Sequence, residues 1–492
     1  MDKPFEYGFD GVKFSNEEDL FTEPTRFAYE FINIKTDRSD VVYDVKDLVS
    51  EFTIFEHIDK PFLTAKMILM DVDPNISLVD AIHFLGTEKV EIKIKTHASN
   101  TFAITKNFVV SEIVAQQKGG DGNELIALEL VEDCAYLSSL MRISKSFKGK
   151  KEEIIEQIIN AIDRELLLPN NLDITGDKLT KLIVPNMHPL EAANWIKDRC
   201  YTKDGYPFFL YSTLADDKIR MADLGALLKL EPINKDTLDY VHSVAYAQQS
   251  KAYTSGNADD LVEPIDQFRE AYTITKLTIQ QNERQLELAR KGFIASRYNF
   301  VDTTTGNNFK IDYDMGKIFE KLIDDQVLRP SNGFYPTMDV NARYGKRIER
   351  MNEFSTREIT HFATSRQFND YADTESYHEG KVTTDHESKI IGKSLRHWLL
   401  KSSLQIQVPG KNFIFKDTNL TIGNIIRCKF LSNREYTPQM ARDEVEDLKK
   451  SGDYLIYTAR HQFTRNEYHV TMDIGRLGSK GYGITPGTRV GV

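Results

Sequence analysis

The sequence predicts a mainly β protein with two similar β-barrel domains, a small helical α+β domain and an insertion. Short runs with apolar residues at every second position occur in two separate regions, as expected for half-buried strands. A stretch with helical periodicity lies between these regions. In both β regions a glycine precedes a well-patterned strand: Gly86 before Val90–Ile94 and Gly423 before Ile426–Phe430. We therefore expect one architectural unit to occur twice in the chain.

The first predicted barrel covers residues 27–140 and contains about six short strands. Val90–Ile94 alternates strictly between apolar and charged residues, which indicates a strand with one buried face. Gly119–Gly122 lies between the runs Phe108–Val114 and Leu125–Leu130 and is a strong hairpin signal. This density of short strands is typical of a small barrel or sandwich.

The α+β domain is predicted at residues 141–236. Apolar residues at helical spacing run from Ile154 to Leu166, and Pro169 is expected to end this helix. A second helix is expected to begin at Pro189, because proline is well tolerated in the first turn. Pro207–Tyr211 is almost wholly apolar and reads as a buried strand.

The second predicted barrel is split by a polar insertion that is rich in tyrosine and arginine. Because such residues are enriched at protein interfaces, we interpret the insertion as a docking surface. A Gly-rich C-terminal arm and an acidic N-terminal arm flank the domains. The boundaries are 1–26 for the N-terminal arm, 237–315 and 401–478 for the split barrel, 316–400 for the insertion and 479–492 for the C-terminal arm.

Composition restricts the function classes. The formal net charge is −11, and the most basic run is Lys145–Lys151, which argues against specific nucleic-acid binding. No stretch approaches the ~20 apolar residues that a membrane span needs, and the N-terminus lacks the pattern of a secretory signal. The three cysteines are far apart in apolar runs and are expected to be reduced core residues: Cys134, Cys200 and Cys428.

Candidate catalytic and metal-binding residues are weakly patterned. Asp71 and Asp73 share one face of a strand end, but paired carboxylates arise easily in a chain with 74 acidic residues. His461 and His469 flank a turn and are interpreted as cross-strand polar residues that face solvent or a neighbour. A metal site is disfavoured because the spacing is loose between its candidate ligands, His361, His378, Asp385 and His386. We predict no enzyme activity, metal or cofactor.

Four segments, taken in order, resemble one known family. The chain is similar to the baseplate central hub protein of contractile-tailed (T4-like) phages, related to the late-control-D and type VI secretion spike-base family. The segments are Phe84–Gly86 with Val90–Ile94; Arg142–Ile159; His188–Tyr211; and Thr421–Gly423 with Gly452–Ile456, His461 and Tyr468–Ile474. They touch most of residues 27–478, whereas the insertion and the C-terminal arm depart from the family pattern.

The resemblance implies a structural role. Hub proteins of this family form homotrimers, in which two barrel (tube) domains per chain make a pseudo-sixfold ring. One face of that ring holds a spike protein with an OB-type barrel, and the other meets the tail tube or tube-initiator proteins, with baseplate wedge proteins as further neighbours. The ring forms part of the DNA conduit in the virion tail and assembles in the host cytoplasm. Two alternatives stay open: a cell-wall hydrolase, and a glycan- or receptor-binding protein at a tail tip.

Interface or lumen residues are expected on the polar faces of the closing strands, since these positions alternate with core residues. Aromatic residues of the insertion are added as docking candidates. The candidates are Glu91, Lys93, Arg427, Lys429, His469, Asp473, Tyr344, Phe354 and Tyr371.

Overall fold

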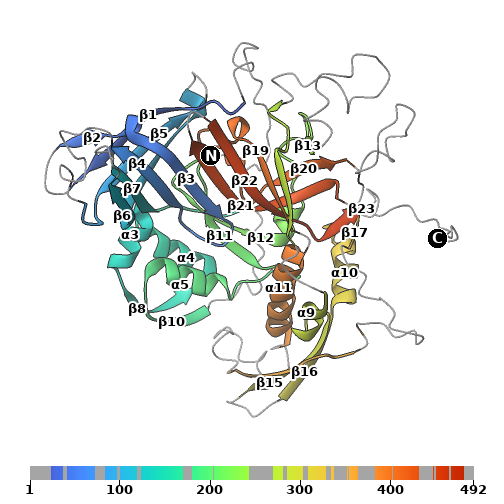
Figure 1. Cartoon of the computed structure of the whole chain (residues 1–492). Helices are drawn as coiled ribbons and strands as arrows, with labels where there is room; N and C mark the ends of the chain where they lie inside the picture. Colours follow the sequence, from blue (N-terminus) through green and yellow to red (C-terminus); the bar gives the residue numbers. More distant parts are fainter. Residues whose placement is uncertain are drawn as a thin grey trace, which may run out of the picture.

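The computed structural model is mainly β, as the sequence predicts, and one thirteen-stranded sheet dominates it (Figure 1). None of the helices in the described part of the chain is long and apolar enough to cross a membrane. The structure describes residues 24–36, 41–71, 82, 84–96, 100–118, 124–169, 180–202, 204–242, 270–280, 285–302, 308–328, 334–336, 352, 354–363, 383–401, 403–431, 447, 450–464 and 467–480.

The first strand set comes from the N-terminal part of the chain and pairs in the order β3-β4-β7-β6-β5-β1. The short strand β2 (Val42–Asp44) continues this order beyond β1. Strands β6 and β7 pair antiparallel up to Lys118 and Glu124, and the predicted turn Gly119–Gly122 between them lies outside the described residues. The set consists of β1 (Ala28–Lys35), β3 (Val49–His57), β4 (Thr64–Asp71), β5 (Lys89–Lys95), β6 (Ala103–Lys118) and β7 (Glu124–Glu132).

The second strand set comes from two distant parts of the chain and repeats this order as β14-β19-β22-β21-β20-β13. One pair differs, because β13 runs parallel to β20 whereas β1 runs antiparallel to β5. The predicted duplication is therefore visible as a repeated order of strand pairing. The set consists of β13 (Tyr240–His242), β14 (Lys276–Gln280), β19 (Ser403–Pro409), β20 (Ile425–Phe430), β21 (Gly452–Thr464) and β22 (Glu467–Gly475).

Strand β21 joins the two sets into one sheet. Along one side it pairs with β22; along the other side its first residues pair with β20 and its last residues pair with β3. The junction runs antiparallel from Thr458 opposite His57 to Thr464 opposite Glu51. Because β21 occupies the free side of β3, the first set does not close on itself through β3. The named strands of the described residues thus form one continuous sheet, and no closed barrel is formed among them. The ends of the second set meet, however, because Val241 of β13 forms a parallel bridge with Thr273, just before β14.

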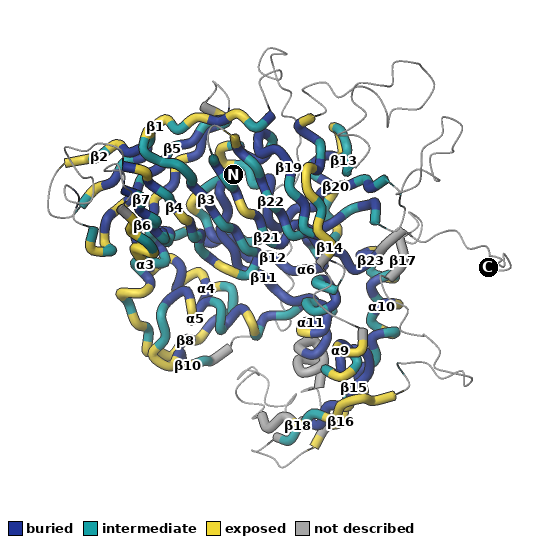
Figure 2. Tube along the Cα trace, viewed as in Figure 1, coloured by how far each residue is buried: buried dark blue, intermediate teal, exposed yellow. Residues whose placement is uncertain are grey.

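The two faces of the sheet differ in polarity, as period-two patterning requires. One face of both strand sets contributes to a single large apolar core, while the opposite face is half-buried or exposed (Figure 2). The register of β5 shows this alternation: Ile92 is buried, whereas Glu91 and Lys93 lie on the polar face.

The α+β module packs beneath the first set around a second core (Figure 1). Its strands form two small sheets, β10-β8 and β11-β12-β9. Strand β11 touches both cores, because Phe208 and Leu210 face the second core while Phe209 and Tyr211 face the first. The module comprises α3 (Asp133–Leu140), β8 (Ile143–Gly149), α4 (Lys151–Asn160), β9 (Leu166–Leu167), β10 (Thr180–Met187), α5 (Pro189–Lys197), β11 (Phe208–Ser212), β12 (Ile219–Asp223) and α6 (Leu224–Leu228).

Helix α4 is shorter than the periodicity predicts. It ends at Asn160, whereas the apolar stripe was expected to continue to Leu166 and stop at Pro169. Asp163 adopts a left-handed backbone conformation with φ of 56°, which is incompatible with a continuing helix. Leu166 instead lies in β9 and pairs parallel with Ile219 of β12. The predicted start of α5 at Pro189 is confirmed.

A third layer lies beside the second set and contains a separate three-stranded sheet, β16-β15-β18 (Figure 1). Strands β15 and β16 were expected in the second barrel, but they pair with each other and with β18 of the insertion. The layer comprises α9 (Gln285–Arg290), β15 (Ala295–Asp302), β16 (Asn308–Asp314), α10 (Met315–Asp324), β17 (Phe334–Pro336), β18 (Glu358–Ala363) and α11 (Thr383–Lys401).

The ends of both predicted arms that adjoin the domains form short strand-like pairings. Arg26 forms a bridge with Glu467, and the Tyr468 N–H donates to the Thr25 carbonyl at 2.7 Å. At the other end, β23 (Gly478–Lys480) pairs antiparallel with β17. The remaining residues of both arms lie outside the described residues.

Candidate functional site: a polar groove across the strand junction

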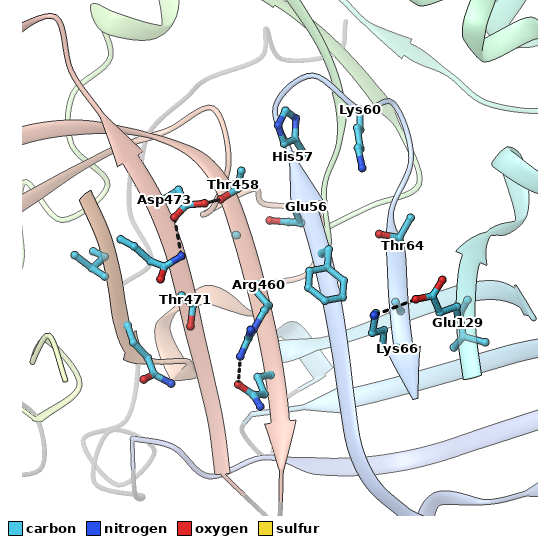
Figure 3. A pocket seen from close by; sticks show the side chains of 18 of the residues that line it. Glu56, His57, Lys60, Thr64, Lys66, Glu129, Thr458, Arg460, Thr471 and Asp473 are labelled. Atoms are coloured by element: carbon cyan, nitrogen blue, oxygen red, sulfur yellow. Dashed lines mark hydrogen bonds and ion pairs between the residues drawn. The ribbon is translucent and has the colours of Figure 1, made fainter. Parts of the chain in front are cut away.

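A polar groove lies where the two strand sets join (Figure 3). It has a volume of about 730 Å³ and crosses β14, β19, β22 and β21 of the second set and β3, β4 and β7 of the first. Side chains of β21, β22, β3 and β4 lie along it in parallel rows in this view. The groove is therefore a shared surface of the two repeated units.

Alternation along β21 explains why the groove is polar. Thr458, Arg460 and Gln462 line the groove, while Ala459 and His461 between them are buried. Neighbouring strands keep the same phase because the pairing is in register across the junction. The face that bears the groove is therefore the polar counterpart of the shared apolar core.

Two carboxylates that line the groove, Glu129 and Asp473, have partners on the same face. The Lys66 ammonium lies 3.0 Å from the Glu129 carboxylate. Asp473 accepts hydrogen bonds from the Thr458 hydroxyl at 2.6 Å and from the Gln405 amide at 2.9 Å (Figure 3). The groove wall therefore carries charged groups of both signs, with Lys60, Lys66, Lys276 and Arg460 beside Glu56, Glu129 and Asp473.

The groove geometry does not favour acid–base chemistry. Burial lowers the pKa of His57 below its ordinary value, although nearby Asp59 acts in the opposite direction. Its Nδ1 accepts the Asp59 N–H at 2.9 Å, so this nitrogen is committed to the turn. Among the described carboxylates of the groove lining, Asp473 and Glu129 are likewise engaged with partners. The third, Glu56, is buried, with Oε1 on the Leu214 N–H and Oε2 3.2 Å from His461 Nε2. A hydrolase would need a carboxylate or imidazole free to exchange a proton with substrate.

Behind the groove, the core side of the sheet holds a fully buried polar chain. His461 Nε2 lies 3.2 Å from Glu56 Oε2, and His461 Nδ1 lies 2.7 Å from the Tyr468 hydroxyl. Glu56 Oε1 accepts the Leu214 N–H at 2.5 Å, which links the sheet to the α+β module. The sequence interpretation of His461 as a wall residue facing solvent or a neighbour is therefore wrong. His469, on the opposite face, is half-buried 3.5 Å from Glu467.

Four further interface candidates sit on polar strand faces, but in different places. Lys93 pairs with Glu30 at 2.9 Å, near Glu91 on β5. Arg427 forms a two-point ion pair with Asp453, at 2.7 and 3.1 Å, on β20 and β21. Lys429 pairs with Asp239 at 2.5 Å. Of the candidates that the structure describes, only Asp473 lines the groove.

The aromatic docking candidates are described in part. Phe354 is 48% exposed, and its role in docking stays a prediction. Tyr344 and Tyr371 lie outside the described residues. The same holds for the side chains of the metal candidates His361, His378, Asp385 and His386. Asp71 is buried at the end of β4, and Asp73 lies outside the described residues.

One acidic cluster that sequence reasoning missed has the composition of a metal site. Glu132, Asp133 and Cys134 place their ligand atoms within 4.8 Å of one another. Two cationic side chains already form ion pairs with this cluster, because Lys106 and Arg164 lie 3.6 and 3.7 Å from the Glu132 carboxylate. Burial, followed by the charge of Glu132, raises the pKa of the Cys134 thiol, so the thiolate that metals prefer is disfavoured. We assign no metal to it.

A second missed cluster connects three layers of the fold. Asp59, in the β3–β4 turn, accepts from Lys197 of α5 at 2.5 Å and from Arg396 of α11 at 2.8 Å. Arg396 also donates to the Phe208 carbonyl of β11 at 2.6 Å. No local motif signals this cluster, since its members come from distant parts of the sequence.

Comparison with family models and with curated proteins gives no match. Solved structures do match over most of the chain. A tail protein from Neisseria meningitidis MC58 aligns at 11% identity and a TM-score of 0.47, covering 91% of this chain and 97% of its own. A 43 kDa tail protein of prophage MuSo2 from Shewanella oneidensis aligns at 8% identity and a TM-score of 0.48, covering 91% of this chain and 98% of its own. A type VI secretion component from E. coli aligns at 9% identity and a TM-score of 0.37, covering 90% of this chain and 76% of its own. That component is itself structurally similar to tail proteins of phage T4.

Proposed function

We propose that the chain is a structural hub of a phage tail baseplate. In this role, three copies form a ring that adapts a threefold spike to the sixfold tail tube and encloses part of the DNA conduit. The observation that carries the proposal is the repeated strand order, joined through β21 and β3 within one chain. Two equivalent units per chain give six units in a trimer, which is the symmetry step that such an adapter requires.

The resemblance of the ordered segments supplies the partners. A spike protein with an OB-type barrel occupies one face of the ring, and tail tube or tube-initiator proteins occupy the other. Wedge proteins of the baseplate are the outer neighbours, with Phe354 of the insertion as a docking residue. The assembled protein resides in the virion tail after assembly in the host cytoplasm.

The polar groove suits the wall of the conduit. Its cations are interspersed with carboxylates, as in the pair Lys66–Glu129, so DNA phosphates gain less by binding there than on a purely basic surface. The acidic net charge of −11 adds a repulsive background for DNA. A conduit must let DNA pass without holding it, and a face of mixed charge meets this need better than a basic patch.

The native mass of the purified chain tests the proposal. We expect light scattering over a concentration series, with and without the spike protein, to find three chains of 56.5 kDa each. Three copies, alone or on the spike, agree with the ring. A monomer or twofold dimer that does not bind the spike protein contradicts the proposal and favours the hydrolase or glycan-binding alternative.

A further inference from the structure

The two strand sets leave two edges open in the described structure. Beyond Val110, the segment Ser111–Lys118 of β6 pairs only with β7 among the described strands. At the end of the sheet, β14 pairs only with β19. In Figure 2 the labels of β3 and β21 lie between those of β6 and β14. We infer that Ser111–Lys118 of one copy pairs antiparallel with Lys276–Gln280 of the next copy.

The inference follows from equivalence between the sets. β6 and β21 occupy the same place in the repeated order, and so do β14 and β3. The first part of β6 pairs with β5, and the first part of β21 pairs with the equivalent strand β20. A shift of register follows in each, at Val110/Glu112 and at Ile456/Thr458, and β6 has a second shift at Ile113/Ala115. Past this shift, β21 pairs with β3. The corresponding part of β6, Ser111–Lys118, has no second partner among the described strands. Strand β14 is the equivalent of β3 and is therefore the expected partner.

Exposed apolar side chains mark the same two edges. Val114 of β6 and Ile279 of β14 are each 53% exposed, and Ile113 is also exposed. An open strand edge with exposed β-branched residues favours pairing with another chain. A second copy would cover all three side chains, whereas an isolated chain leaves them in water.

The geometry of the two edges sets the type of assembly. They are different surfaces, so the contact is head-to-tail and generates a ring when the rotation closes. Each chain then contributes one junction within itself, β21 with β3, and one to its neighbour, β6 with β14. In a trimer the two junctions alternate around six positions. The inference rests on the proposed ring and specifies how its subunits meet.

The internal junction also supplies the register. Gln462 lies opposite Thr53 across β21 and β3. On β6, Gln117 pairs with Leu125 of β7 in the place where Gln462 pairs with His469 of β22. On β14, Thr278 pairs with Gln405 of β19 in the place where Thr53 pairs with Lys66 of β4. Gln117 of one copy is therefore expected opposite Thr278 of the next.

Cysteine cross-linking tests this register. Opposed residues of an antiparallel pair are close enough for a disulfide, and the three native cysteines are buried. We expect the variant with Gln117→Cys and Thr278→Cys to form covalent dimers and trimers on oxidation. Each single variant should stay uncross-linked. As a matched control, Gln462→Cys with Thr53→Cys should form a disulfide within one chain.

Two edge variants test the contact without cross-linking. Val114→Asp and Ile279→Asp change exposed positions, so circular dichroism should show the parent fold. We expect loss of the trimer at concentrations where the parent chain is trimeric. The pairing is overturned, and the ring is not, if both aspartate variants remain trimeric and the variant with Gln117→Cys and Thr278→Cys forms no cross-link between chains. Absence of a trimer in the parent chain, with and without the spike, overturns both the ring and the pairing.

Discussion

At the scale of single residues, Glu56 is one of the buried charged groups of the sheet. It is fully buried, with one oxygen on the Leu214 N–H and the other beside His461. A buried carboxylate is tolerated only when its oxygens find partners, because desolvation is otherwise costly. Here the partners come from β21 and from the α+β module, so one side chain fixes the position of both.

Removing this carboxylate should destabilise the protein strongly. Glu56→Ala leaves the Leu214 N–H and His461 without their partner, and breaking a buried pair costs roughly 3–5 kcal/mol. Urea unfolding should show this loss in the free energy of unfolding. Glu129→Ala is the matched control, because its ion pair with Lys66 is largely exposed and such pairs contribute at most about 1 kcal/mol. Equal losses in the two variants would contradict a structural role for Glu56.

Residue burial on the strands follows from the sequence, but polar partners do not. Period-two patterning correctly placed Ile92 in the core and Glu91 on the polar face, because a strand's two faces alternate strictly. The same patterning treated His461 as polar and therefore exposed. Its burial depends on Glu56 and Tyr468, and no local pattern reports that a distant carboxylate will meet it.

At the scale of elements, Asp59 connects the β3–β4 turn with α5 and α11. Burial alone would raise the pKa of Asp59, but the charges of Arg396 and Lys197 outweigh it and hold the pKa below its ordinary value. A carboxyl whose pKa is lowered on folding stabilises the fold above its unfolded pKa, which is about 3.9. This contribution is lost as the pH falls through the lower, folded pKa.

The pH dependence of stability should reveal this connection. We expect Asp59→Asn to be less stable than the parent at pH 7 by roughly 2 kcal/mol, since it loses two charge-assisted hydrogen bonds. The difference should shrink as the pH is lowered from about 5 toward 2. Thermal unfolding of both proteins across this range measures it. A difference that does not vary with pH would mean that the carboxylate charge contributes nothing.

Elements were easier to predict than their partners. The starts of α5 and of the buried strand at Phe208 were visible in the sequence, because proline and apolar runs act locally. Helix α4 ended early because Asp163 leaves the helical conformation, and Leu166 gained a strand partner in β12 instead. Barrel closure was expected because both β regions looked self-contained. Pairing of β3 with β21 depends on which edges meet in three dimensions, which periodicity does not encode.

At the scale of the whole molecule, the continuous sheet and strand β11 make the layers interdependent. The two strand sets share one core, and that core extends to Trp398 of α11. The α+β module has its own core, against which Trp195 of α5 packs. Alternate residues of β11 belong to the two cores, with Phe209 in the first and Phe208 in the second. Loosening either core removes one side of the packing of β11, so the cores should unfold together.

The two tryptophans allow this coupling to be measured, because the chain has only these two. In the variant Trp195→Phe fluorescence reports on the large core, and in Trp398→Phe it reports on the α+β module. We expect each variant's fluorescence transition in urea to coincide with its own transition by circular dichroism, as for a single cooperative unit. Comparing probes within one variant removes the effect of the substitution on stability. If the fluorescence of Trp398→Phe changed at lower urea than its circular dichroism, the α+β module would unfold separately. In that case β11 would not couple the cores, and a hub built on this chain would have to obtain its rigidity from the neighbouring copies.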